Sequence, residues 1–258
     1  MWERELKIAK AVAIEAGKAI MEIYDKVEIE VEYKDDHSPL TAADKASNDK
    51  IVAVLKREFP DYAILSEEEK DNLSRLNNDF CFVVDPLDGT KEFIKRNGQF
   101  TVNIALAHCH ESVMGVIYVP VTGELYYASR GYGAYKMDKE GAVERLQVSD
   151  NTDVSTLKVV MSNSHGCAEM DVLMEKYQLK NFVKVGSSLK GCMVATGQAD
   201  IYYRYNPTME WDTAAMQCIV EEAGGLFAQM DDTPMRYNRE NSLNDKGFYA
   251  INCKENRI

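Results

Sequence analysis

Two aspartates stand three residues apart in the stretch VVDPLDGTKEF, residues 83–93, directly behind a run of aliphatic side chains. The valines at its start belong in a protein interior, whereas Asp85 and Asp88 are among the side chains least often buried without a partner. The proline and glycine that follow them favour a turn over a continuing strand or helix. Two explanations are open: an ordinary Asp-Pro, Asp-Gly turn, or a strand end where a positive group lies between the carboxylates.

The overall charge narrows the possible partners. The chain of 258 residues contains 42 acidic and 30 basic side chains, a net charge of −12 with neutral histidines. Such an acidic protein is a poor candidate for non-specific binding to nucleic acid or to an anionic membrane surface. A phosphorylated small substrate is still compatible, because bound divalent cations can reverse the sign of the local field.

The N-terminus and the cysteines indicate the cellular compartment in which the protein is expected to work. The first twenty residues have apolar side chains at helical spacing with charges between them, so neither a signal peptide nor a membrane span is expected. The six cysteines are scattered and form no Cys-x-x-Cys pair. We interpret them as reduced core residues of a cytoplasmic protein rather than as a disulfide or metal site.

Hydrophobic periodicity divides the chain into two parts. Residues 1–150 are expected to form an α+β subdomain with an antiparallel sheet, which carries the acidic motifs. Its expected elements are a helix over 3–25, a strand over 27–34, a helix from the N-cap Thr41 to about Phe59, strands over 62–65 and 80–85, and a sheet-like region over 100–129. In residues 151–258 strands and helices alternate, which predicts a layered α/β subdomain packed tightly against the first.

Three acidic clusters stand where an apolar strand or a strand-to-helix turn ends. They are Glu67 and Glu68, Asp85 and Asp88, and Asp212 at the start of a helix. One cluster alone would be weak evidence, because a run of glutamates is usually a solvated surface. Three together are better explained by a shared site for hard divalent cations, which prefer carboxylate and carbonyl oxygens. The spacing of the central aspartates also lets the carbonyl of Leu87 point the same way as their carboxylates.

The motif DPLDGTKEF, with LSEEE upstream and WDTAA…EEAGG downstream, resembles the lithium-sensitive, magnesium-dependent phosphatase superfamily that includes inositol monophosphatase. The resemblance covers nearly the whole chain. The continuation EFIKRNGQFTVNIAL, with SPLTAAD and GSSLK, is similar to the 3′(2′),5′-bisphosphate nucleotidases of the CysQ type, whereas inositol monophosphatases usually carry Thr-Thr-Asn-Phe at Thr-Lys-Glu-Phe. The resemblance implies a layered α-β-α-β-α sandwich of the inositol monophosphatase and fructose-bisphosphatase type.

The same resemblance implies two or three Mg²⁺ ions and assigns roles around them. The metal ligands that it implies are Glu67, Asp85, the carbonyl of Leu87, Asp88 and Asp212. Asp85 is expected to bridge two ions, and Glu68 to support the ligands from behind. Thr90, with Asp44 behind it, is expected to orient and deprotonate the attacking water in an in-line displacement at phosphorus.

The resemblance also implies a nucleotide site formed largely by the second half of the chain. The expected substrate contacts are Gly89, Thr90, Ser162, His165, Gly186, Ser187, Ser188, Lys190, Arg204 and Asp212. Gly89 and Thr90 are expected to start a helix whose N–H groups hold phosphate oxygens. This chain departs from the related proteins at Asn163, where they often have arginine, and Arg204 is a candidate replacement cation near the 5′-phosphate.

The expected function is Mg²⁺-dependent removal of the 3′-phosphate of adenosine 3′,5′-bisphosphate to give AMP, and also action on 3′-phosphoadenylyl sulfate, which links the protein to sulfur metabolism. Two alternatives stay open: an inositol or sugar phosphatase, disfavoured by Lys91 and Glu92, and a non-enzymatic nucleotide-binding regulator. A monomer and a homodimer are both compatible with the sequence. Peripheral association with the inner face of the membrane also stays open, because some bacterial relatives are assigned there.

Overall fold

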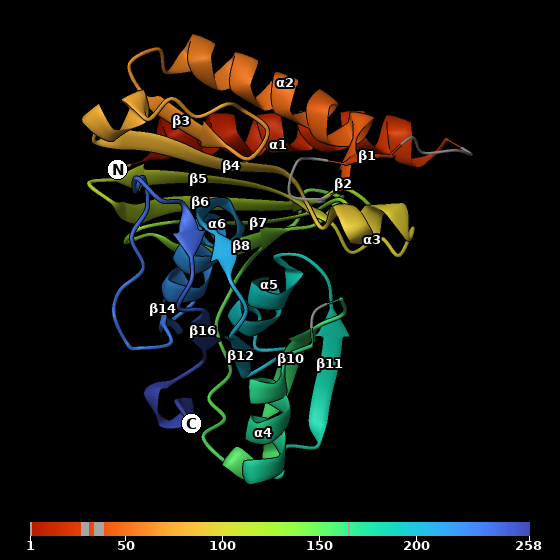
Figure 1. Cartoon of the computed structure of the whole chain (residues 1–258), viewed down its shortest axis with the longest axis vertical. Coiled ribbons are helices and arrows are strands. Elements are labelled where there is room, and N and C mark those ends of the chain that lie inside the picture. The colour runs from red at the N-terminus through yellow and green to blue at the C-terminus, as the bar shows by residue number, and fades with distance from the viewer. Residues whose placement is uncertain (1, 27–30, 34–38, 165) are drawn as a thin grey trace.

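The computed structural model describes residues 2–26, 31–33, 39–164 and 166–258. These residues form five layers in the order helix, sheet, helix, sheet and helix (Figure 1). The predicted α-β-α-β-α sandwich is therefore confirmed. The segment around residue 150 lies between the last strand of the first sheet and the first strand of the second. The division into two subdomains at that point stays a prediction.

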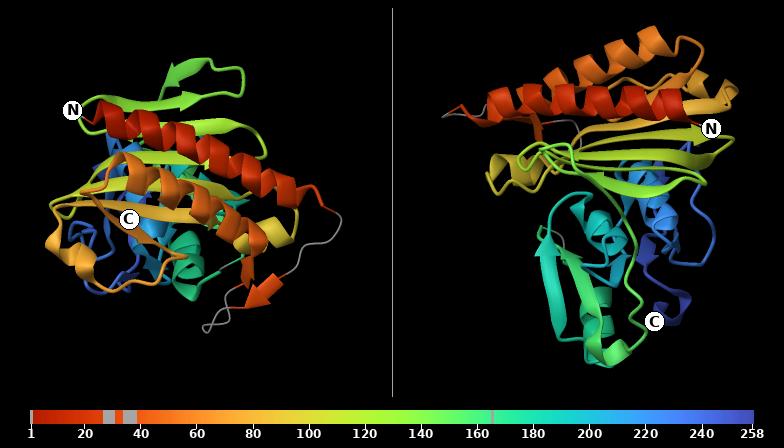
Figure 2. Two further views of the ribbon diagram at one scale, coloured as in Figure 1. Left: turned by 90° about the horizontal axis from the view of Figure 1, so that it is seen from above. Right: turned by 180° about the vertical axis from the view of Figure 1, so that it is seen from behind.

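Two helices, α1 (Glu3–Tyr24) and α2 (Ala42–Glu58), form the first layer and lie across one face of a seven-stranded sheet (Figure 2). Both predicted helices are confirmed. α2 begins after its predicted N-cap, Thr41, whose Oγ1 accepts a hydrogen bond from the N–H of Ala43 at 3.2 Å. In return, the N–H of Thr41 donates to Oδ2 of Asp44 at 2.8 Å. This reciprocal pairing satisfies two backbone donors that a helix start leaves free.

The second layer is a sheet with the strand order β3-β4-β5-β6-β7-β8-β9. Its strands are β3 (Ala63–Ser66), β4 (Phe80–Asp88), β5 (Thr101–His108), β6 (Glu111–Val119), β7 (Glu124–Ser129), β8 (Gly133–Met137) and β9 (Val143–Arg145). The antiparallel sheet expected here is confirmed for every neighbouring pair except β3 and β4, which are parallel. Of the strand expected over 27–34, only β1 (Val31–Tyr33) lies within the described residues, and it pairs with β2 (Pro39–Thr41).

The prediction that the chain turns at Asp85 is wrong, because β4 runs on to Asp88. Asp85 pairs with Asn103 and Asp88 with Thr101, so three steps along β4 match two steps along β5. The extra residue forms a β-bulge, which accommodates Pro86 because a bulge needs no ladder hydrogen bond from it. In a regular strand, residues three apart point to opposite faces. The bulge thus turns both aspartates to the same side.

The middle layer consists of α5 (Leu189–Ala195) and α6 (Glu210–Glu222), which lie between the two sheets (Figure 1). α6 packs on β4 to β7, on the face opposite to α1 and α2. At Gly115 of β6 the approach is so close that a Cβ atom would lie 2.3 Å from the carbonyl oxygen of Ala215. A residue without a side chain at this point therefore lets α6 sit directly on the sheet.

The fourth layer is a five-stranded sheet, and the fifth is α4 (Ala168–Lys176) on its outer face. In spatial order its strands are β11 (Asn181–Val185), β10 (Lys158–Ser162), β12 (Ile201–Arg204), β16 (Phe248–Ile251) and β14 (Leu226–Gln229). Strand–helix alternation in this half is confirmed. The smaller elements are α3 (Thr90–Ile94), the pair β13 (Thr208–Met209) and β15 (Leu243–Asn244), and the 3₁₀ turns η1 (Ser74–Asn77), η2 (Val154–Thr156) and η3 (Lys254–Asn256).

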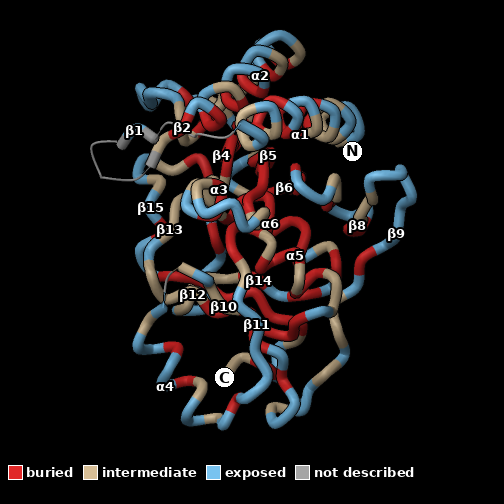
Figure 3. The backbone as a smooth tube through the Cα atoms, turned by 90° about the vertical axis from the view of Figure 1, so that its right-hand side faces the viewer, coloured by how far each residue is buried: buried red, intermediate tan, exposed pale blue. Residues whose placement is uncertain are grey.

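Burial concentrates in the two sheets and in the helices between them (Figure 3). All six cysteines are free thiols, and Cys81, Cys192 and Cys218 are buried in the core as predicted. The core interpretation is wrong for Cys109, which is exposed in the turn after β5, and Cys167 and Cys253 are partly exposed. Within the described ranges, no helix is long and apolar enough to cross a membrane.

Candidate active site

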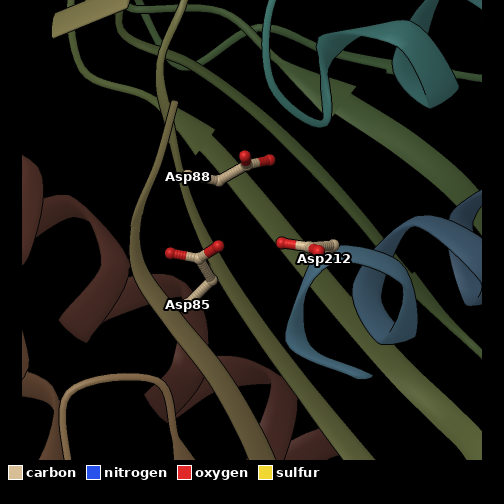
Figure 4. A group of neighbouring side chains, drawn as sticks. All are labelled: Asp85, Asp88 and Asp212. Atoms are coloured by element: carbon tan, nitrogen blue, oxygen red, sulfur yellow. The ribbon is translucent and has the colours of Figure 1, made fainter. Parts of the chain in front are cut away.

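Three aspartates from distant parts of the chain meet where β4 ends and α6 begins. Asp85 and Asp88 project from the end of β4, and Asp212 projects from the first turn of α6 (Figure 4). One carboxylate oxygen of each lies within 4.8 Å of the others. In the part of the chain that the structure describes, no lysine or arginine forms an ion pair with any of the three. The cluster is therefore a concentration of negative charge that the nearby Lys190 and Arg204 offset without a direct ion pair.

The environment of this cluster raises the pKa of the carboxyl groups of Asp85 and Asp212. Burial, followed by the charges of Glu67 and Asp88, holds the pKa of Asp85 well above its ordinary value. Burial, followed by the charge of Asp88, raises the pKa of Asp212 to about 8. A divalent cation would relieve this repulsion, and the donors are all hard oxygens of the kind that Mg²⁺ and Ca²⁺ prefer. The residues present therefore fit a site for such an ion.

The bulge of β4 is held in place by short contacts. The N–H of Leu87 donates to Oδ1 of Asp85 at 3.1 Å, which fixes that carboxylate within its own turn. From α2, the buried hydroxyl of Ser47 donates to the carbonyl of Pro86 at 2.7 Å. The hydroxyl of Thr90 lies 3.4 Å from the carbonyl oxygen of Leu87. The predicted ligand carbonyl thus lies beside the predicted catalytic threonine.

The predicted catalytic pair is also brought together. Thr90 is the first residue of α3, and its Oγ1 donates to Oδ1 of Asp44 at 3.2 Å. The other carboxylate oxygen of Asp44 accepts from the hydroxyl of Thr41 at 2.6 Å. Burial raises the pKa of Asp44, while these hydrogen bonds lower it. A carboxylate with a raised pKa is a stronger proton acceptor than an ordinary one, and the role of Asp44 as acceptor stays a prediction.

A cavity of about 230 Å³ opens in front of the aspartates. The predicted site residues that line it are Glu67, Asp88, Gly89, Thr90, Ser162, Gly186, Ser187, Ser188, Lys190, Arg204 and Asp212. Further lining residues, which were not predicted as contacts, are Lys91, Glu92, Tyr202, Thr208, Met216 and Phe248. His165 lies outside the described residues. Glu68 is half-buried, and its supporting role stays a prediction.

Three cationic residues among those described line this cavity: Lys91, Lys190 and Arg204. Lys190, in the first turn of α5, is only 7% exposed, and its Nζ donates to the carbonyl of Ser187 at 2.5 Å. Its Nζ also lies 5.6 Å from the centre of the Tyr202 ring. Burial lowers the pKa of Lys190 to about 8, the nearby Asp88 raises it, and Arg204 lowers it again. The lining of the cavity therefore combines carboxylates with cations, and the charges of Lys190 and Arg204 act on the aspartates themselves.

Asn163, the position where related proteins often have arginine, does not place a charge in the cavity. Its side-chain amide donates to Oε1 of Gln99 at 2.5 Å, and the N–H of Gly186 donates to the same oxygen at 2.9 Å. A Cβ atom at Gly186 would lie 2.5 Å from Cγ of Glu92. Asn163 and Gly186 thus anchor two segments of the second half to the chain that follows α3.

Sequence reasoning missed the polar residues that support the aspartates. Ser47 holds the bulge, and Asn103 of β5 lies opposite Asp85 in the strand register. Asn103 is a polar residue between the aliphatic Val102 and Ile104 in the strand FTVNIALA, and that contrast was a usable signal. Ser47 is one of several small residues in α2 and carried no such signal.

The chain belongs to the inositol monophosphatase family, whose family model matches residues 1–255. The predicted class, a phosphatase of this family, is therefore confirmed. Among curated proteins, the chain is 41% identical to the 3′(2′),5′-bisphosphate nucleotidase CysQ of Escherichia coli (strain K12), over 92% of this chain and 95% of that protein. Identity to the protein of the same name from Haemophilus influenzae is 32%, over 93% and 90% of the two chains.

Solved structures agree with this placement. The crystal structure of CysQ from Bacteroides thetaiotaomicron, described as a bacterial member of the inositol monophosphatase family, superposes with a TM-score of 0.86 at 41% identity. That match covers 98% of this chain and 99% of the other. The extragenic suppressor protein suhB from Bartonella henselae superposes with a TM-score of 0.84 at 27% identity, over 99% and 96% of the two chains.

Proposed function

We propose that the protein removes the 3′-phosphate of adenosine 3′,5′-bisphosphate, giving AMP and inorganic phosphate, and that it also acts on 3′-phosphoadenylyl sulfate. The observation that carries this proposal is the cavity lining, in which the cations Lys190 and Arg204 occur together with the carboxylate cluster. A substrate with two separate phosphates can use both, one phosphate at a metal ion held by the carboxylates and the other at the cations. The curated relatives named 3′(2′),5′-bisphosphate nucleotidase support the same choice.

We propose Mg²⁺ as the cofactor, with two or three ions per site. The ligands would be Glu67, Asp85, the carbonyl of Leu87, Asp88 and Asp212. When bound, such ions neutralise phosphate charge and make water a stronger nucleophile. The oxygen-only donor set favours a hard cation of this kind over a softer transition metal.

The residues of the chain supply positioning and proton transfer. Because the hydroxyl of Thr90 donates to Asp44, its lone pairs can accept a proton from a water molecule in the cavity. As that proton arrives, the hydroxyl proton of Thr90 moves to Oδ1 of Asp44. Lys190 and Arg204 would hold the 5′-phosphate, which keeps the 3′-phosphate at the aspartates.

The test is a panel of phosphate esters with Mg²⁺ and with EDTA. Adenosine 3′,5′-bisphosphate, 3′-phosphoadenylyl sulfate, 3′-AMP, inositol 1-phosphate and fructose 1,6-bisphosphate are compared by phosphate release. We expect the two bisphosphorylated nucleotides to give the highest kcat/KM and EDTA to abolish it. Preference for inositol or sugar phosphates would move the protein to the alternative substrate class. Nucleotide binding without phosphate release from any ester would make it a non-enzymatic binder.

A further inference from the structure

Ser188, which lines the cavity, and Asn103, which is not among the lining residues, take part in a chain of hydrogen bonds that ends on a single carboxylate oxygen. The hydroxyl of Ser188 lies 2.6 Å from Oδ2 of Asp88, and Ser188 is almost completely buried. The side-chain amide of Asn103 donates to Oγ of Ser188 at 2.9 Å and lies 3.3 Å from Oδ2 of Asp88. The hydroxyl of Thr101 donates to the amide oxygen of Asn103 at 3.0 Å.

Donor and acceptor capacities fix the direction of this chain. An ionised carboxylate only accepts, so Ser188 must donate its one proton to Asp88 and can only accept from Asn103. That requirement places the NH₂ of Asn103 toward Ser188 and its oxygen toward Thr101, where a hydroxyl donates to it. The carbonyl of Asp212, at 3.3 Å, is a weaker competitor for the proton of Ser188 than the charged oxygen at 2.6 Å.

Each aspartate of the cluster has one oxygen fixed by a donor, but only Asp88 depends on a distant part of the chain. Asp85 is held by the N–H of Leu87, two residues away, and Asp212 by the N–H of Met209, three residues away, at 2.6 Å. Asp88 is held by Ser188, one hundred residues along the chain. The orientation of Asp88 therefore depends on how the start of α5 docks on the seven-stranded sheet.

We propose that Ser188 and Asn103 are positioning residues that hold Asp88 for metal binding, so that the hydroxyl proton of Ser188 serves Asp88 rather than the nucleotide. Their bonds occupy Oδ2 of Asp88 and leave its other oxygen for the cation. Outer partners of this kind commonly contribute about 10- to 100-fold to metal affinity. The inference rests on the proposed metal site, but it does not depend on the identity of the substrate.

The experiment measures metal binding directly. Mn²⁺ is titrated into the full chain, and the free ion is quantified by its electron paramagnetic resonance signal. We expect Ser188→Ala to raise the dissociation constant about tenfold or more. Asn103→Leu, which keeps side-chain size, should have a similar effect. The bond from Asn103 to Ser188, at 2.9 Å, is shorter than its direct contact with Asp88, at 3.3 Å, so Asn103 acts mainly through Ser188. The double variant should therefore have a dissociation constant within about twofold of that of the weaker-binding single variant.

Ser112→Ala is the matched control. Ser112 is also buried, and its hydroxyl donates across the interface between β6 and α6 to the carbonyl of Ala214 at 2.7 Å. The Ser112→Ala variant should lose about as much thermal stability as Ser188→Ala. Its affinity for Mn²⁺ should equal that of the unchanged protein. The proposal is overturned if Ser188→Ala binds Mn²⁺ within about twofold of the unchanged protein, or if the control loses as much affinity. Failure of the unchanged protein to release phosphate from nucleotides would instead refute the proposed substrate and leave this result standing.

Discussion

Replacing Lys190 by methionine is expected to weaken the binding of a bisphosphate and to stabilise the fold, and both effects have one physical origin. The ammonium group is almost completely buried, and this burial lowers its pKa from the ordinary 10.5 to about 8. The difference corresponds to roughly 3.4 kcal/mol by which folding disfavours the charged form. The folded protein therefore holds a cation that has already lost most of its hydration and can bind an anion strongly.

The effect on binding follows from that state. A hydrogen bond between a phosphate and a charged group contributes about 1.5–3 kcal/mol, so its loss should raise KM for adenosine 3′,5′-bisphosphate by about 10- to 150-fold. 3′-AMP has no 5′-phosphate to lose the contact, and its KM should change much less. A similar rise in KM for both substrates would mean that Lys190 supports the metal site or the fold instead.

The effect on stability has the opposite sign. The folded pKa of Lys190 lies below its unfolded value, so its destabilisation is complete below pH 8 and fades as the pH rises toward 10.5. After the loss of the hydrogen bond to the carbonyl of Ser187, Lys190→Met should still raise the free energy of unfolding at pH 7 by about 2 kcal/mol. The gain should shrink toward pH 10.5.

Steady-state kinetics with both substrates and urea unfolding at two pH values check these expectations. Lys184→Met, on the exposed strand β11, is the control that should change neither quantity. If Lys190→Met has a lower free energy of unfolding than the unchanged protein at pH 7, the inference that the buried ammonium destabilises the fold is refuted. That result would show that the ammonium stabilises the local structure through its bond to Ser187.

Four further outcomes are expected. Asp85→Asn should reduce turnover to less than about a tenth without unfolding the protein, which circular dichroism and kinetics together check, because the carboxylate at the centre of the cluster is lost. Mg²⁺ should raise the thermal midpoint and EDTA should lower it, because the cation relieves repulsion among buried carboxylates. For adenosine 3′,5′-bisphosphate, kcat/KM should fall as the pH rises past about 8, and Lys190→Arg, whose guanidinium stays charged, should lack this decline. Lithium should inhibit, and more of it should be needed as Mg²⁺ rises; inhibition equal to that by sodium would contradict the expectation.

The fold was predictable where a local pattern decides the local structure. The helical spacing of α1 and the capping pair Thr41 and Asp44 of α2 depend on residues within a few positions of one another. The acidic motifs could be recognised for the same reason, since each lies at one terminus of a single helix or strand. The layered sandwich followed from the resemblance more than from periodicity, which fixes elements but not the faces on which they pack.

The bulge at Pro86 and the support of Asp88 were not predictable in this way. A proline and a glycine after a strand favour a turn, and only the pairing of β4 with β5 shows that the strand absorbs the extra residue. The contact from Ser188 joins residues one hundred positions apart, so no local pattern carries it. The burial of Lys190 could not be predicted either, because lysine is rarely buried and no neighbouring residue in the sequence indicates that this one is.

The layers explain why one site draws on both halves of the chain. α6 sits directly on the sheet at Gly115, and its first turn therefore reaches the end of β4, where the bulge presents two aspartates. α5 packs beside α6 and brings Ser188 to Asp88 while it carries Lys190 into the cavity wall. Because one short segment supports a proposed metal ligand and carries the cation proposed to bind the 5′-phosphate, a shift of α5 would disturb both at once. Coupling between metal binding and bisphosphate binding is thus expected from the packing itself, and it must act equally in both directions.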